Sequence, residues 1–129
     1  MRQAPATPPG FSVPEFAIFQ TLIRLGLQPD VDFVFQSPLF GGRLERGGLV
    51  IDFLFINPPD LAINVQGEFF HQEQGADVVA RDRLARAALA GEGITLIFID
   101  ASDALAEPDR MVRDALNYRD NSFLGGIGG

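Results

Sequence analysis

The sequence predicts an α/β domain with a central mixed sheet of about four strands, and two observations carry this prediction. Apolar runs at residues 49–56, 61–65 and 94–99 have the composition of strands that are buried on both faces. The segments at 14–25 and 77–90 are predicted to be helices, and strands of this kind need helices as cover on both faces. A chain of 129 residues is long enough for one domain with a substantial core.

The N-terminal part is predicted to form an arm, a helix and a strand. Residues 1–13 contain three prolines and no periodic apolar pattern, which indicates an extended arm. Pro14 suits the first turn of a helix that Ser12 can cap and that Gly26 ends. Residues 31–35 alternate between apolar and more polar positions, as in a strand with one solvated face.

Turns divide the next part of the chain into strands. Four glycines at 40–48 indicate a hairpin-like loop, and the Asn-Pro-Pro-Asp run at 57–60 is a strong turn signal. The three strands around these turns can form a meander. A helix then returns the chain to the strand at 94–99, which is expected to lie parallel to the strand at 61–65 through a right-handed crossover.

Two helices and a tail complete the predicted order. Asp77 is a plausible N-cap for the crossover helix, which is expected to run to about residue 90. Pro108 suits the first turn of a last helix. Residues 119–129 end in a Gly-rich run and resemble a tail. The folded domain is therefore expected to span residues 14–118, between the arm and this tail.

Composition excludes several classes of function. All ten basic residues are Arg, and 17 acidic residues give a formal net charge of −7, which opposes generic binding to nucleic acid. No apolar stretch reaches the ~18–20 residues that a membrane span needs. Residues 1–10 lack the apolar region of a signal peptide, so secretion by that route is not expected. The absence of Cys excludes disulfides and thiolate metal sites.

The candidate site centres on Asp52, the one carboxylate in the apolar run at 49–56. An unpaired buried carboxylate is costly, so Asp52 is expected either to pair with Arg43, Arg46 or Arg81 or to bind a metal ion. Glu68 is read either as a solvated loop residue or as a second metal ligand. The polar positions that follow the next apolar run, Leu61-Ala62-Ile63, are Asn64, Gln66, Glu68 and His71. His71 fits a hydrogen-bonded structural residue or a catalytic base.

The order of these residues resembles a known family of enzymes. The matching residues are Val50-Ile51-Asp52-Phe53, Ala62-Ile63-Asn64-Val65-Gln66-Gly67, His71, Asp77, Arg81-Asp82, Leu89, Gly93 and the apolar run at 94–99. Together they resemble the PD-(D/E)XK nuclease superfamily, closest to its very-short-patch-repair-like endonucleases. The resemblance implies a three-layer, restriction-endonuclease-like core of order αβββαβ, to which this chain adds a C-terminal helix.

The resemblance also implies a role for each position. Asp52 matches the metal-binding Asp, and Asn64 stands where the second carboxylate of the family should be. Gln66 stands at the position of the Lys or its substitute, and His71 matches a His near the active site of the repair branch. Glu15 matches a Glu that some members place on the first helix.

Two functions from different classes follow. Asn64 and Gln66 remove charges that bind Mg²⁺ and stabilise the transition state, so the first is a catalytically degenerate domain, a pseudoenzyme with no cofactor. The alternative is an active Mg²⁺-dependent DNA endonuclease, with Asp52 and Glu68 as metal ligands and Gln66 and His71 as further site residues.

The degenerate domain is expected to act as a structural or interaction module in a larger assembly. The arm at 1–13 and the tail at 119–129 have too little apolar content to fold alone, so both are expected to be ordered by other protein chains. Phe11 is the predicted anchor at one end; Phe123, Leu124 and Ile127 are the predicted anchors at the other. A phage virion is the expected assembly, with the cytoplasm as the alternative location.

The basic residues of the crossover helix have two interpretations. Arg81, Arg83 and Arg86 are clustered in the sequence. They fit a solvated helix face that pairs with Asp77 and Asp82, or a local contact with DNA.

Overall fold

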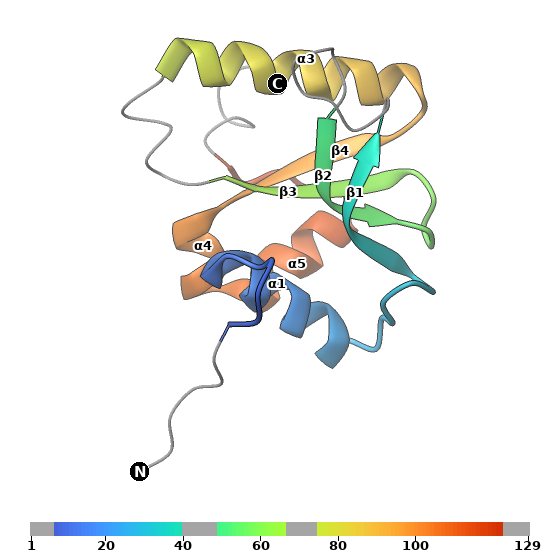
Figure 1. Cartoon of the computed structure of the whole chain (residues 1–129), viewed down its shortest axis with the longest axis vertical. Coiled ribbons are helices and arrows are strands. Elements are labelled where there is room, and N and C mark those ends of the chain that lie inside the picture. The colour runs from blue at the N-terminus through green and yellow to red at the C-terminus, as the bar shows by residue number, and fades with distance from the viewer. Residues whose placement is uncertain (1–6, 40–48, 67–74, 123–129) are drawn as a thin grey trace.

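A computed structural model of the chain describes residues 7–39, 49–66 and 75–122 and shows an α/β domain with one open, four-stranded mixed sheet (Figure 1). The predicted α/β class with a mixed sheet of about four strands is therefore confirmed. The elements are α1 (Val13–Arg24), β1 (Phe33–Leu39), β2 (Leu49–Phe55), β3 (Leu61–Gln66), α3 (Gly75–Gly91), β4 (Thr95–Asp100), α4 (Ala101–Ala106) and α5 (Pro108–Leu116).

The sheet has the predicted connectivity. Its strand order is β1-β2-β3-β4, with antiparallel pairing of β1 to β2 and of β2 to β3. β3 and β4 are parallel, with Ala62 opposite Leu96 and Val65 opposite Ile99, and α3 lies between them in the chain. The expected meander and the expected parallel return of the last strand are both confirmed.

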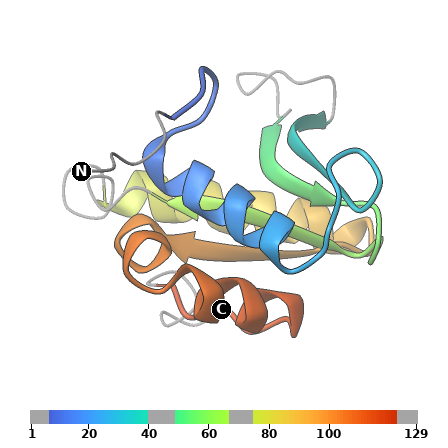
Figure 2. The ribbon, with the colours of Figure 1, turned by 90° about the horizontal axis from the view of Figure 1, so that it is seen from below.

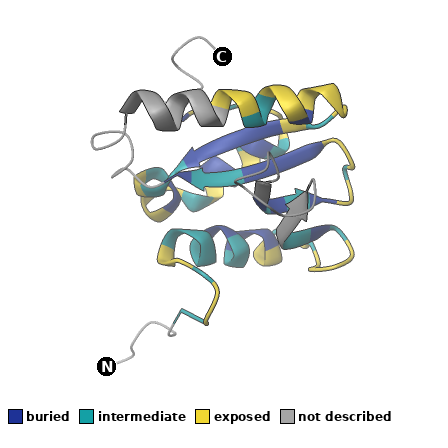
Figure 3. Ribbon diagram, turned by 45° about the horizontal axis from the view of Figure 1, so that its top comes forward, coloured by how far each residue is buried: buried dark blue, intermediate teal, exposed yellow. Residues whose placement is uncertain are grey.

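Helices cover both faces of the sheet. α3 lies on one face, and α1, α4 and α5 lie on the other (Figures 1 and 2). The buried residues concentrate in the strands between these two helical layers (Figure 3). The larger core joins the sheet to α1 and α5 and includes Phe33, Phe53 and Leu22; the smaller core joins it to α3 and includes Leu89 and Phe98.

Some element boundaries differ from the prediction. β1 begins at Phe33 rather than at residue 31, because the preceding residues form a turn in which the Asp32 carboxylate accepts the Gln28 N–H. β1 also contains Pro38, which the sheet tolerates because β1 is an edge strand. α3 begins at Gly75, so Asp77 lies inside the helix rather than at its N-cap.

α4 was not predicted from the sequence. It has only six residues and carries a single buried side chain, that of Ala104. A helix this short presents too few positions for a periodic apolar pattern. Pro108, as expected, lies at the start of the next helix, α5.

The described parts of both ends pack on their own domain. The ring of Phe11 stacks on that of Phe35, with 4.1 Å between ring centroids, and also contacts Phe16 and Phe19. Residues 119–122 bond to α5 and β4, so within one chain Phe11 and these residues are ordered by their own domain, without the other chains that were expected to order them. Phe123, Leu124 and Ile127 lie outside the described residues. Among the described helices, none combines the length and apolar character that a membrane crossing requires.

Candidate functional site

The candidate site lies where β2 separates from β3. Regular pairing joins Phe53 to Ile63 and Leu54 to Ala62. One residue before Phe53, bonds from the backbone to side chains take the place of backbone pairing between β2 and β3. The Asp52 N–H donates to Asn64 Oδ1 at 2.8 Å, and the Val65 N–H donates to Asp52 Oδ2 at 2.8 Å. We call this pair of reciprocal bonds the Asp52–Asn64 clamp. β1 and β2 curl out of the plane of β3 and β4 (Figures 1 and 2), so the clamp holds strands that are diverging.

Glu15 reaches Asp52 from the first turn of α1. Its position is set by a capping box, in which the Glu15 N–H donates to Ser12 Oγ at 3.2 Å and the Ser12 N–H donates to Glu15 Oε1 at 2.8 Å. The Glu15 side chain also hydrogen-bonds that of Asp52. We call these two residues the acidic pair.

The environment of the acidic pair favours the protonated form of Asp52. Burial raises the pKa of Asp52 from its ordinary value of 3.8 to about 7. The Val65 N–H bond lowers this pKa, whereas the negative charge of Glu15 and its hydrogen bond raise it. Asp52 therefore changes its charge near neutral pH.

The structure brings together only part of the predicted site. Asp52, Asn64 and Glu15 meet as described, and Gln66 follows on β3, where its side chain is buried at 9% exposure and its register partner on β4 is Asp100. Glu68 and His71 lie outside the described residues. The same holds for Arg43 and Arg46 and for the Arg81 side chain, the proposed ion-pair partners of Asp52.

Arg86 is not part of a solvated basic strip. Its guanidinium contacts the Asp120 carboxylate at 3.4 Å and lies 5.1 Å from the ring centroid of Phe98. Its side chain is 24% exposed. Arg86 joins α3 to β4 and to the residues after α5; the side chains of Asp77 and Asp82, its expected partners, lie outside the described residues.

The acidic pair has some of the donors that a hard divalent cation needs. Mg²⁺ is usually held by one or two carboxylates, with waters and substrate oxygens completing its coordination. Asp52 and Glu15 supply two carboxylates, and Asn64 supplies a neutral oxygen. Within the described residues, however, no group of three His, Cys, Asp or Glu side chains could hold a metal ion. The described residues thus supply only part of the coordination shell of such an ion.

The sequence itself contains the signal that links Ser12 to the site. Ser12 was predicted as a cap, and Glu15 three residues later completes the Ser-x-x-Glu signature of a capping box. That signature fixes the Glu15 carboxylate beside the helix N-terminus. Only the fold places Asp52 next to it.

The fold and the site define an α/β domain with a half-buried acidic pair at the point where its sheet opens. Comparison with known proteins finds no family model, no curated protein and no solved structure that matches this chain. The resemblance to the PD-(D/E)XK nucleases therefore depends on the order of elements and on the residues named above.

Proposed function

We propose that this chain is a catalytically degenerate, PD-(D/E)XK nuclease-like domain that serves as an interaction module for other proteins. The observation that carries the proposal is the Asp52–Asn64 clamp. At the position where the family places its second metal-binding carboxylate, this chain has an amide whose oxygen accepts the Asp52 N–H. Asn64 thus holds β2 against β3 and adds no charge for a metal ion.

The remaining site chemistry supports loss of catalysis. Phosphodiester cleavage needs positive charge near the phosphate as negative charge develops in the transition state. Gln66 is neutral and buried, and the chain contains no Lys that could supply an ammonium group from elsewhere. The acidic pair alone would add negative charge beside a phosphate.

Charge favours protein over nucleic acid as the partner. A formal net charge of −7 repels the phosphate backbone. Large apolar side chains are exposed on several elements, among them Leu84 at 72%, Leu105 at 53% and Val31 at 58%. A place in a phage virion stays a prediction for such a module.

The proposal is tested by cleavage and stability assays on the same variants. Plasmid and branched DNA are incubated with the protein and Mg²⁺ or Mn²⁺, and no cleavage is expected from the wild type or from Asp52→Ala. Asn64→Ala should lower the free energy of unfolding by about 1–3 kcal/mol, because it leaves the Asp52 N–H without its acceptor. Cleavage by the wild type that disappears in Asp52→Ala would overturn the proposal.

A second candidate function is favoured by Glu15. A carboxylate with a raised pKa beside a second carboxylate is also typical of a site for a divalent cation, so an Mg²⁺-dependent endonuclease is the alternative. Bound Mg²⁺ would supply positive charge to the scissile phosphate, and Asp52 and Glu15 would hold it. In this case Glu15→Gln and Asp52→Ala should both abolish cleavage. The double variant Asn64→Glu, Gln66→Lys should raise Mn²⁺ affinity under either function if the site backbone is intact.

A further inference from the structure

Residues 117–122, which we call the C-terminal strap, run from the end of α5 to the outer edge of β4. β4 is an edge strand. The Phe98 N–H, on the side of β4 away from β3, donates to Asp120 Oδ2 at 2.9 Å. The N–H and the hydroxyl of Ser122 both donate to Asp120 Oδ1, and Ser122 is only 5% exposed. The strap therefore places the Asp120 carboxylate against the edge of the sheet, in a position that we call the carboxylate seat.

α3 also contributes to the carboxylate seat. Arg86 of α3 contacts Asp120 Oδ2 at 3.4 Å while its guanidinium lies over the Phe98 ring. The Asp120 side chain is 15% exposed, so the ion pair is largely shielded from water. An acidic side chain in this position is thus recognised by an edge N–H and an Arg together.

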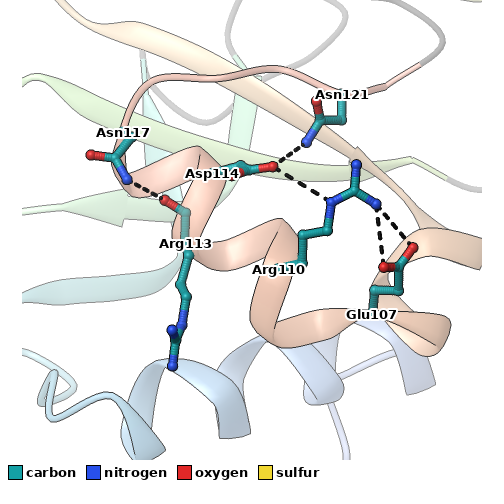
Figure 4. A network of polar contacts seen from close by, with 6 residues as sticks. All are labelled: Glu107, Arg110, Arg113, Asp114, Asn117 and Asn121. Carbon is teal, nitrogen blue, oxygen red and sulfur yellow. Dashed lines mark hydrogen bonds and ion pairs between the residues drawn. The ribbon is translucent and has the colours of Figure 1, made fainter.

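Polar contacts also fasten the strap to α5. The Asn121 Nδ2 donates to Asp114 Oδ2 at 2.7 Å, and Arg110 lies 3.9 Å from the same carboxylate (Figure 4). Apart from Tyr118, the strap has no large apolar side chain. Its attachment is therefore a small set of specific polar bonds, which an identical segment from another copy can reproduce.

Tyr118 makes the connection between α5 and the strap strained. Its φ of 63° lies in the left-handed region, at the C-terminal position where helices usually have Gly. The Tyr118 N–H donates to the Ala115 carbonyl and the Arg119 N–H to the Asp114 carbonyl, which is the Schellman pattern. The compensating bond is from the Tyr118 hydroxyl to Asp60 Oδ1 at 2.6 Å.

We propose that two copies of this chain exchange their C-terminal straps. In the exchanged dimer Asp120 of each copy occupies the seat formed by Arg86 and the Phe98 N–H of the other. Tyr118 is the hinge of the exchange and changes from its left-handed conformation to an extended one. The strap residues after Tyr118 make the same contacts as before, but with the other copy. Exchange of an identical element is a low-cost route to a closed dimer. The proposal does not depend on the acidic pair or on its chemistry.

The test compares two small residues at the hinge. Tyr118→Ala and Tyr118→Gly both remove the hydroxyl bond to Asp60, but only Ala keeps the left-handed strain. A closed dimer relieves the strain at two hinges, and ~1 kcal/mol at each corresponds to a factor of about 30 in the equilibrium constant, so the dimerisation constant of the Ala variant should exceed that of the Gly variant by about thirtyfold. The constants are measured by analytical ultracentrifugation of full chains after equilibration.

Mixed dimers and a seat variant complete the experiment. The chain has no Cys, so Ser102→Cys on α4 gives one exposed site for donor and acceptor dyes, and mixed samples should develop energy transfer. Asp120→Ala should abolish it, because the strap then fits neither its own domain nor the other copy. The proposal is overturned if Tyr118→Ala stays monomeric, if the Ala and Gly variants dimerise equally, or if Asp120→Ala dimerises like the wild type.

Discussion

The pH dependence of stability gives the sharpest test of the acidic pair. Asp52→Asn keeps an oxygen for the Val65 N–H and removes the titrating group. In the wild type the pKa of Asp52 is about 7 in the folded state, against 3.8 when unperturbed. Between these values the folded chain binds more protons than the unfolded chain, so the free energy of unfolding falls as pH rises from about 4 to about 7 and is level above that range.

The expected magnitude follows from this difference in pKa. It amounts to roughly three pH units, each equivalent to 1.36 kcal/mol, so the wild type should lose up to about 4 kcal/mol across the range. Asp52→Asn carries no charge at this position at any pH. It should therefore be about 2–4 kcal/mol more stable than the wild type at pH 8, with the difference shrinking toward pH 4.

Urea unfolding followed by far-UV circular dichroism at pH 4.5–8.5 measures this difference. Glu92→Gln is the matched control, since it removes one carboxylate from an exposed turn after α3. Wild-type stability that is flat or rising between pH 5 and 7 would refute the reasoning. Stabilisation of the wild type at pH 8 by Mg²⁺, absent in Asp52→Asn, would instead favour the endonuclease function.

Two further predictions concern the residues around this pair. Glu15→Gln keeps the capping box but removes the like charge, so the pKa of Asp52 should fall, as followed by carboxyl ¹³C shifts in a pH titration; an unchanged pKa would show that Glu15 does not face Asp52. Phe11→Ala should lower the free energy of unfolding by about 2–4 kcal/mol, because Phe11 stacks on Phe35, and the measurement is urea unfolding. A loss below ~0.5 kcal/mol, the usual range for surface substitutions, would mean that the N-terminal segment is not fastened there.

The central elements could be predicted because their apolar pattern is local. The strands around Asp52, Ile63 and Ile97 are apolar at nearly every position, and burial on both faces follows directly from that composition. The packing of the chain ends on the domain could not be predicted in the same way. Phe11 has no periodic apolar neighbours in sequence, and its partners Phe19 and Phe35 come together with it only in the folded chain.

The candidate site was predicted in its positions but not in its bonds. Asp52 was conspicuous because a charge inside an apolar strand is rare, and Asn64 because the family resemblance requires a carboxylate there. That their side chains bond across the two strands depends on the point at which β2 leaves β3, which no local pattern encodes. The proximity of Glu15 likewise depends on how α1 packs.

The two outer strands of the sheet have a consequence for behaviour at high concentration. An exposed strand edge is a template on which further chains add, and fibrils grow in this way. Here Pro38 of edge strand β1 has no N–H to donate, and Asp120 accepts the Phe98 N–H of edge strand β4. Each outer strand thus has one edge position at which an added strand cannot form its usual hydrogen bond, and a loss of solubility in Asp120→Ala would show that the β4 edge limits aggregation.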